Sequence, residues 1–171
     1  MQDFVNTEIP EWSRDDLASP AELGSWLASR GLLRAGSRPG VADLEAAHAL
    51  RAALRALALA NTTGVAPSGA ARAEIDDALR ALPFEVALDD QGALRARPAG
   101  TGAPAALAAL VAIVLDAERE GTWPRLKACR KHSCGWLFFD QSRNRSSNWC
   151  SMGICGNRTK TAAYRRRKAE R

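Results

Sequence analysis

Apolar residues recur at helical spacing in four stretches of the chain, and these stretches predict its main elements. Residues 41–61 carry the longest stripe, with apolar side chains three or four positions apart. Residues 19–30 begin with a Ser-Pro pair that suits a helix start, and residues 68–82 repeat the helical pattern. Residues 104–120 are apolar on most sides and end in charged residues, which favours a buried helix over a membrane span.

Alternating apolar residues are confined to short segments. Residues 84–88 and 94–96 flank an Asp-Asp-Gln-Gly turn and predict a β-hairpin, and residues 136–139 predict one more strand. A basic segment, residues 157–169, predicts a C-terminal helix. The chain is therefore expected to be mainly α with a small β-hairpin, which is an α+β fold.

Charge divides the chain into two parts. Residues 121–171 contain 13 Lys or Arg and 2 Asp or Glu, whereas residues 1–120 contain 11 and 17. This segregation indicates a surface for a polyanion, although a solubilising basic tail would have the same composition. We expect a helical N-terminal domain over residues 1–122 and a small basic module over residues 123–171.

All four cysteines lie in this basic module, as two pairs with four residues inside each pair: Cys129, Cys134, Cys150 and Cys155. Each pair can present two thiolates from one tight turn, which is the arrangement that a tetrahedral metal requires. Four thiolates leave no open coordination position, so we expect one structural zinc ion. His132 lies inside the first pair and could replace one cysteine as a ligand.

Other chemistry for the cysteines stays open at this point. Two disulfides in any of three pairings, another metal, or free thiols would fit the same spacing. The first residues show neither the basic nor the apolar region of a signal peptide. A reducing cytoplasm is therefore the expected location, and structural disulfides are rare there.

The C-terminal sequence resembles the CGNR zinc finger family. The resemblance rests on Cys155-Gly156-Asn157-Arg158, on Phe138-Phe139-Asp140-Gln141-Ser142-Arg143-Asn144, and on the basic tail. The upstream sequence resembles the ABATE domain, the usual companion of that finger, in its Asp3-Phe4-Val5-Asn6-Thr7 segment and in a long helix that carries Arg51 and Arg55. The resemblance implies zinc held by the four cysteines and a DNA-binding role in stress-induced regulation of transcription.

Several residues of the basic module have expected roles. Gly156 should permit a tight turn after the last cysteine, and Asn157 should cap the basic helix. Arg158 should find a partner in Asp140 or another internal group, a thiolate, or a phosphate. Asp140 should accept hydrogen bonds from loop amides or from an arginine. The expected nucleic-acid contacts are Arg143, Arg145, Arg158, Lys160, Arg165, Arg166, Arg167 and Lys168.

The acidic N-terminal domain is expected to bind a small-molecule or protein effector. Arg51 and Arg55 lie one helical turn apart and could hold an anion with Asn6 and Thr7; ion pairs with acidic side chains are the alternative. The sequence has no phosphate-binding loop, nucleophile elbow or His-Glu-x-x-His motif, so we do not expect an enzyme.

These patterns favour a DNA-binding transcriptional regulator with a structural zinc ion and no membrane partner. Two alternatives remain: a protein–protein adaptor, or an RNA-binding protein, in which the zinc module is only a scaffold. A dimer would suit paired half-sites on DNA, but no heptad pattern requires an oligomer.

Overall fold

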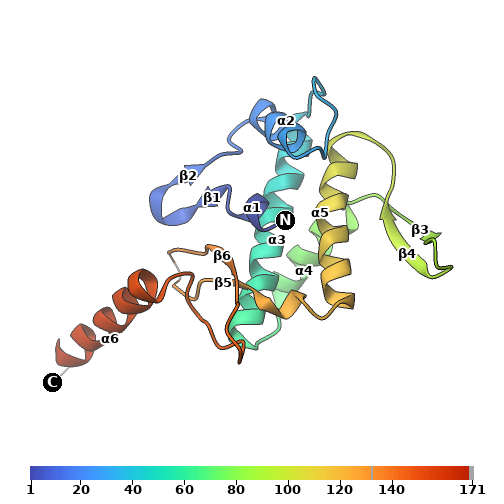
Figure 1. Cartoon of the computed structure of the whole chain (residues 1–171). Helices are drawn as coiled ribbons and strands as arrows, with labels where there is room; N and C mark the ends of the chain where they lie inside the picture. Colours follow the sequence, from blue (N-terminus) through green and yellow to red (C-terminus); the bar gives the residue numbers. More distant parts are fainter. Residues whose placement is uncertain (132, 170–171) are drawn as a thin grey trace.

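The computed structural model describes residues 1–131 and 133–169, and most of its ordered elements are helices (Figure 1). The longer helices are α2 (Pro20–Ser29), α3 (Val41–Thr63), α4 (Gly69–Arg80), α5 (Gly102–Arg119) and α6 (Asn157–Ala169). The short helical turns are α1 (Gln2–Val5), η1 (Pro10–Trp12), η2 (Trp123–Arg125) and η3 (Met152–Gly156). The antiparallel strand pairs are β1 (Glu8–Ile9) with β2 (Arg14–Asp15), β3 (Phe84–Leu88) with β4 (Leu94–Pro98), and β5 (Leu126–Ala128) with β6 (Leu137–Phe139). The predicted α+β class is confirmed.

Helix α3 is the centre of the fold, because α1, α2, α4, α5 and β5 all pack against it. Its apolar stripe buries Ala47, Leu50 and Leu54 almost completely. The helix runs to Thr63, slightly beyond the predicted end, and stops at Gly64, whose φ of 71° is a left-handed cap that glycine adopts without strain. Helix α5 covers the same core, which confirms the prediction that residues 104–120 form a buried helix.

The hydrophobic core continues across residue 122. Trp123, Leu126 and Leu137 belong to the same buried cluster as the apolar faces of α3 and α5. The β5–β6 pair, whose connecting segment carries the first two cysteines, therefore rests on the N-terminal helices. The division into residues 1–122 and 123–171 stays a prediction, and any such division cuts through this shared core.

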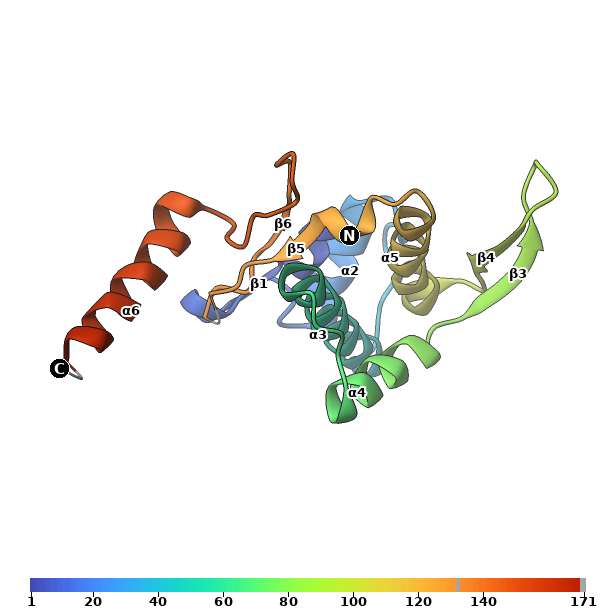
Figure 2. The same ribbon diagram turned by 90° about the horizontal axis from the view of Figure 1, so that it is seen from below.

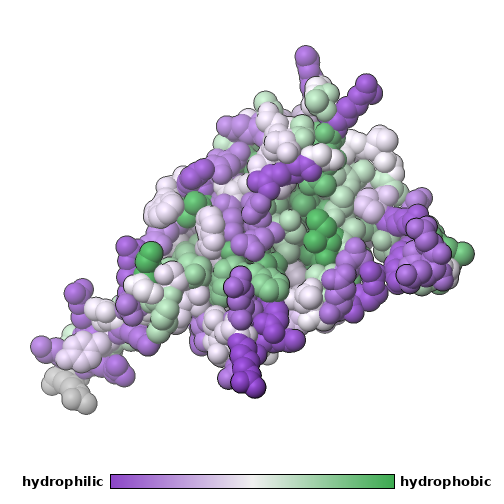
Figure 3. Space-filling view, viewed as in Figure 1, coloured by the Kyte–Doolittle hydropathy of each residue, from purple (hydrophilic) through white to green (hydrophobic). Residues whose placement is uncertain are grey.

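Helix α6 and the β3–β4 hairpin project from opposite sides of the molecule in both views (Figures 1 and 2). The hairpin pairs Val86 with Ala96 and Leu88 with Leu94, as the alternation predicts. Its apolar face is nevertheless open to solvent, since the side chains of Val86, Leu88 and Leu94 are exposed. Hydrophilic side chains predominate along α6, whereas hydrophobic ones gather over α5 (Figure 3).

Within residues 1–131 and 133–169, no helix combines the length and the apolar character needed to cross a bilayer.

Candidate metal centre and nucleic-acid interface

The four cysteines converge on one point. Their Sγ atoms all lie within 4.8 Å of one another. The distance from Cys134 to Cys150 is 3.7 Å, and that from Cys150 to Cys155 is 3.6 Å. Zinc–sulfur bonds of about 2.3 Å in a tetrahedron place the sulfurs about 3.8 Å apart. The donor set and its spacing thus fit a zinc ion, and these distances are too long for S–S bonds.

The end of strand β5 and the η3 turn position the four sulfurs. Cys129 follows β5, and its backbone N–H donates to the carbonyl of Trp136 at 2.8 Å, which closes the turn that contains Cys134. Cys150 and Cys155 lie on either side of the start of the η3 turn. Trp136 and Trp149, both partly buried, pack against this sulfur cluster. His132, the alternative ligand, lies outside the described residues.

Burial makes two of the four thiols, those of Cys134 and Cys150, difficult to ionise without a cation. It raises the pKa of Cys134 to about 11 and also raises that of Cys150. Burial acts in the same direction on Cys129, but hydrogen bonds from the backbone amides of Cys150 and Lys131 outweigh it, so the pKa of Cys129 is lowered. A bound divalent cation deprotonates coordinating thiols. A bound metal would therefore stabilise the thiolate form of Cys134 and Cys150 in this cluster.

The start of the basic helix differs from the prediction. The η3 turn continues directly into α6, and Asn157 has helical backbone angles (φ −65°, ψ −43°), so the prediction that Asn157 is the cap is wrong. Ser151 is the cap instead, because its Oγ accepts a hydrogen bond from a backbone amide of the first turn. Gly156 serves close packing rather than a turn: a Cβ there would overlap Met152 Sδ and approach Trp149 Cδ1 to 3.1 Å.

Asp140 organises the loop between the two cysteine pairs. Its carboxylate accepts hydrogen bonds from the backbone amides of Ser142 at 2.9 Å and Ser147 at 3.0 Å, as predicted. Its charged partner is Lys127 at 2.8 Å, not an arginine, and both side chains are buried. Burial raises the pKa of Asp140, but the hydrogen bonds from Lys127 and the two serines outweigh this and hold it well below its usual range. The carboxylate is thus a fixed anion at the centre of the loop.

The predicted nucleic-acid contacts lie on two exposed segments. Arg143 and Arg145 are on the loop that Asp140 organises, and the other six cations are on α6, which has no buried residue. Helix α6 leaves the body at the metal site, where the Thr159 hydroxyl donates to the carbonyl of Cys155 at 2.8 Å. Arg158 pairs with Glu11 at 3.1 Å rather than with Asp140. Among ion pairs between described residues, none involves the remaining seven cations.

The two arginines of α3 face carboxylates. Arg51 is buried and places Nη1 and Nη2 each 2.6 Å from the carboxylate of Asp15, and Nη1 also donates to the Thr7 hydroxyl at 3.1 Å. Arg55 pairs with Glu8. Burial raises the pKa of Asp15, yet the bonds from Arg51 and a backbone amide lower it overall. Both guanidinium groups therefore form ion pairs with carboxylates of the protein. The binding of an anion by Asn6, Thr7, Arg51 and Arg55 stays a prediction.

Two polar residues of α3, Asn61 and Thr62, connect the zinc module to the helices and were not predicted from the sequence. The Asn61 side chain donates to the carbonyls of Trp123 at 3.0 Å and Leu126 at 2.9 Å, and the Thr62 hydroxyl donates to that of Ala128 at 2.7 Å. The only sequence feature that could have indicated this contact is the presence of two polar residues in a helix otherwise rich in alanine and leucine. They sit at the last turn of α3, where a polar side chain can equally well face solvent.

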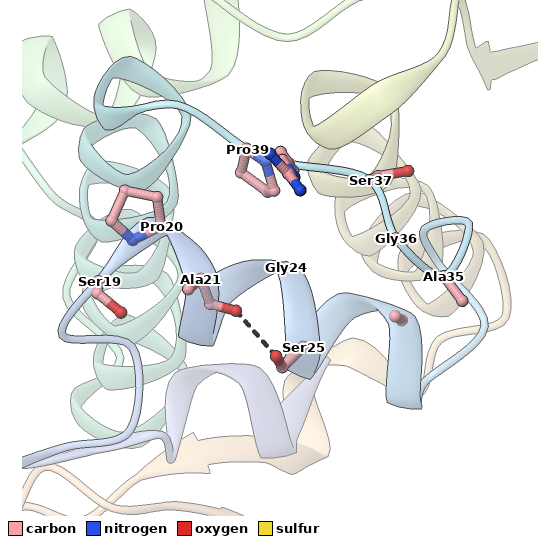
Figure 4. Close-up of a pocket in the computed structure, with 11 residues that line it drawn as sticks. Ser19, Pro20, Ala21, Gly24, Ser25, Ala35, Gly36, Ser37 and Pro39 are labelled. Atoms are coloured by element: carbon pink, nitrogen blue, oxygen red, sulfur yellow. Dashed lines mark hydrogen bonds between the residues drawn. The ribbon is translucent and has the colours of Figure 1, made fainter.

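The N-terminal domain contains an open cavity of about 700 Å³ between α2 and the segment before α3. Small side chains and backbone line it, including Gly24, Gly36 and Pro39 (Figure 4). The Ser25 hydroxyl bonds to the carbonyl of Ala21 at 2.9 Å and is engaged within its own helix. Arg38 is the one charged residue in this lining.

Comparison with known families agrees with this architecture. Residues 1–119 match the ABATE model, described as "Putative stress-induced transcription regulator", and residues 125–168 match the CGNR zinc finger model. The chain therefore belongs to the ABATE family and ends in a CGNR zinc finger. Neither family description names a catalytic activity. No curated protein shows significant similarity to the chain.

Proposed function

We propose that this protein is a zinc-dependent, DNA-binding transcriptional regulator in which one structural zinc ion shapes the nucleic-acid surface. The observation that carries the proposal is the junction between metal site and helix: α6 begins two residues after the fourth cysteine, directly after the η3 turn, and has no buried residue. A metal that fixes Cys155 thereby fixes the base of a helix rich in arginine and lysine. Such a helix can follow a phosphate backbone or enter a major groove.

The loop around Asp140 supports the same proposal. Lys127 and two backbone amides immobilise its carboxylate, so the exposed Arg143 and Arg145 project from a rigid loop. A rigid loop loses less conformational entropy when its arginines contact phosphates. Loop and helix together give the finger two basic segments, both attached to the metal site.

The test is a titration of fluorescent duplex DNA of random sequence with the zinc-loaded full chain over a series of salt concentrations. We expect log Kobs to fall linearly with log salt. Replacing all four residues of 165–168 with alanine should reduce the slope by about 2–4 units, because each lost phosphate contact removes about 0.9 unit. An unchanged slope would remove α6 from the interface.

A matched control removes four exposed arginines from the N-terminal domain: Arg34, Arg38, Arg72 and Arg80. This variant has the same net charge as the α6 variant but should retain the wild-type slope. Single-stranded RNA and a polyglutamate peptide, added as competitors, separate the DNA proposal from its alternatives. Tighter binding to either competitor than to duplex DNA would favour an RNA-binding protein or a protein adaptor.

The cavity beside α2 is the candidate site for an effector. Its volume of about 700 Å³ would accommodate a small organic molecule, and its lining of small residues leaves room for one. A thermal-shift screen of metabolite mixtures should find compounds that stabilise the wild type. Ala28→Phe fills part of this cavity and should abolish the shift. A shift that persists in Ala28→Phe would place the effector elsewhere.

A further inference from the structure

Glu11 of the N-terminal domain contacts two cations of the zinc finger. Its Oε1 lies 2.5 Å from Lys131 Nζ and 3.1 Å from Arg158 Nη1. Lys131 belongs to the turn between the first two cysteines, and Arg158 lies in the first turn of α6. The carboxylate of Glu11 thus contacts both halves of the metal-binding module, although Glu11 precedes them by more than a hundred positions.

The position of Glu11 is set by the body of the protein. It lies in η1, at the tip of the β1–β2 hairpin, where Ser13 turns the chain with a φ of 49°. Arg51 and Arg55 of α3 hold the base of the hairpin through Asp15 and Glu8. The arginine side chains of these ion pairs are largely buried. The pairs hold the hairpin so that its tip points toward the finger.

We propose that Glu11 is an internal competitor for the phosphates that Lys131 and Arg158 would otherwise bind, so that the β1–β2 hairpin sets the affinity of the finger for nucleic acid. This inference rests on the proposed function. Arg158 keeps 61% of its side chain exposed while paired, so a phosphate can approach it from solvent. Lys131 is more enclosed, at 19%, and becomes available only when the carboxylate withdraws.

The sign of the effect follows from electrostatics. A carboxylate beside two cations neutralises part of their field and also repels an approaching phosphate. Removing its charge should therefore strengthen binding and release the two cations for phosphate contacts. If Glu11 instead oriented Arg158 for DNA, its removal would weaken binding. A change in the hairpin, such as one caused by a ligand of the N-terminal domain, would act on the finger through this contact.

The experiment compares wild type with Glu11→Gln, both zinc-loaded and full length, using random-sequence duplex DNA at several salt concentrations. We expect Glu11→Gln to lower Kd at low salt by about 3–10-fold and to steepen the salt slope by about 1–2 units, one for each released cation. Glu11→Lys should lower Kd further. Zinc content and melting temperature establish that each variant is folded.

Asp77→Asn is the charge-matched control. Asp77 forms an exposed ion pair with Arg80 on α4, far from the finger in sequence, and its loss changes net charge by the same amount. We expect little change in Kd or slope for this variant. A second control places Glu11→Gln in a chain with Lys131→Met and Arg158→Met, where the tightening should vanish.

The outcomes separate the two proposals. If the wild type binds DNA and Glu11→Gln leaves Kd unchanged or raises it, the competition by Glu11 is overturned and the proposed function stands. A chain that shows no salt-dependent binding to duplex DNA in any variant overturns the proposed function and this inference with it. Tightening that survives in the Lys131→Met, Arg158→Met background would also overturn the competition, because Glu11 would then act through general charge and not through these two cations.

Discussion

The side-chain amide of Asn6 binds both backbone groups of Leu137. Its Nδ2 donates to the Leu137 carbonyl at 3.0 Å, and the Leu137 N–H donates to its Oδ1 at 2.8 Å. Both residues are buried, and 131 positions separate them. Asn6 thereby imitates a neighbouring β-strand and pairs with β6 of the zinc finger. The opening segment of the ABATE domain is thus part of the finger's structural support.

Asn6→Ala should destabilise the whole protein. The substitution leaves the Leu137 N–H buried without an acceptor, whereas Gln2 still donates to the carbonyl at 3.3 Å. The loss of two hydrogen bonds and the unpaired donor should cost about 2–4 kcal/mol of unfolding free energy. Urea denaturation measures it, and Asn144→Ala, an exposed asparagine, serves as the control. A cost below about 0.5 kcal/mol would mean that Asn6 and Leu137 do not pair in solution.

Zinc removal should unfold the finger and leave the helical core in place. The purified chain should contain one zinc ion, and Cys155→Ser should bind it much more weakly, because a ligand thiolate is lost. The buried residues of α3 and α5 contact one another without the sulfurs, so their packing should persist. Hydrogen exchange after chelation should show lost protection in residues 149–157, which carry the second cysteine pair, and retained protection in α3 and in β6, which belongs to the shared core. Protection that persists in both regions of the metal-free chain would contradict a structural role for zinc.

The sequence predicted those features that repeat locally. The stripes of α3 and α5 follow from residue spacing, and the metal centre follows from the two cysteine pairs. Strand β5 was missed because three residues are too few to show alternation. Lys127 was missed because a buried ammonium looks like any surface lysine in a basic segment. The pairing of Asn6 with Leu137 leaves no local signal, since the contact exists only after the chain has folded.

The buried pair of Asp140 and Lys127 gives a prediction about pH. The lowered pKa of Asp140 means that its stabilising effect is complete above the unfolded pKa of about 3.9 and is lost as the pH falls toward the folded value. The destabilisation caused by Asp140→Asn should therefore be constant between about pH 6 and pH 8. Lys127→Met should cost about 3–5 kcal/mol, because it strands a buried carboxylate.

Asp116→Asn provides the comparison for this pair, since Asp116 forms an exposed ion pair with Arg119 at a helix end. Exposed pairs contribute about 0–1 kcal/mol, so this variant should resemble wild type. Denaturation at several pH values measures the free energy of unfolding of Asp140→Asn and of Asp116→Asn. A cost of Asp140→Asn that grows or shrinks across neutral pH would indicate that another group, with a pKa in that range, controls the loop.

Gly156→Ala should weaken the metal site by crowding rather than by backbone strain. The new Cβ would meet Met152 Sδ and Trp149 Cδ1, and Trp149 packs against the cysteine cluster. Met152 is half exposed and can swing away, so the expected cost is about 1–2 kcal/mol rather than complete unfolding. Zinc affinity, measured by competition with a chromophoric chelator, should fall, and Met152→Ala in the same chain should restore part of it. Gly153→Ala is the matched control, because its Cβ would meet only Ser151 Oγ at 3.9 Å. Equal losses for Gly153→Ala and Gly156→Ala would contradict the packing explanation, since only Gly156 lies against the tryptophan.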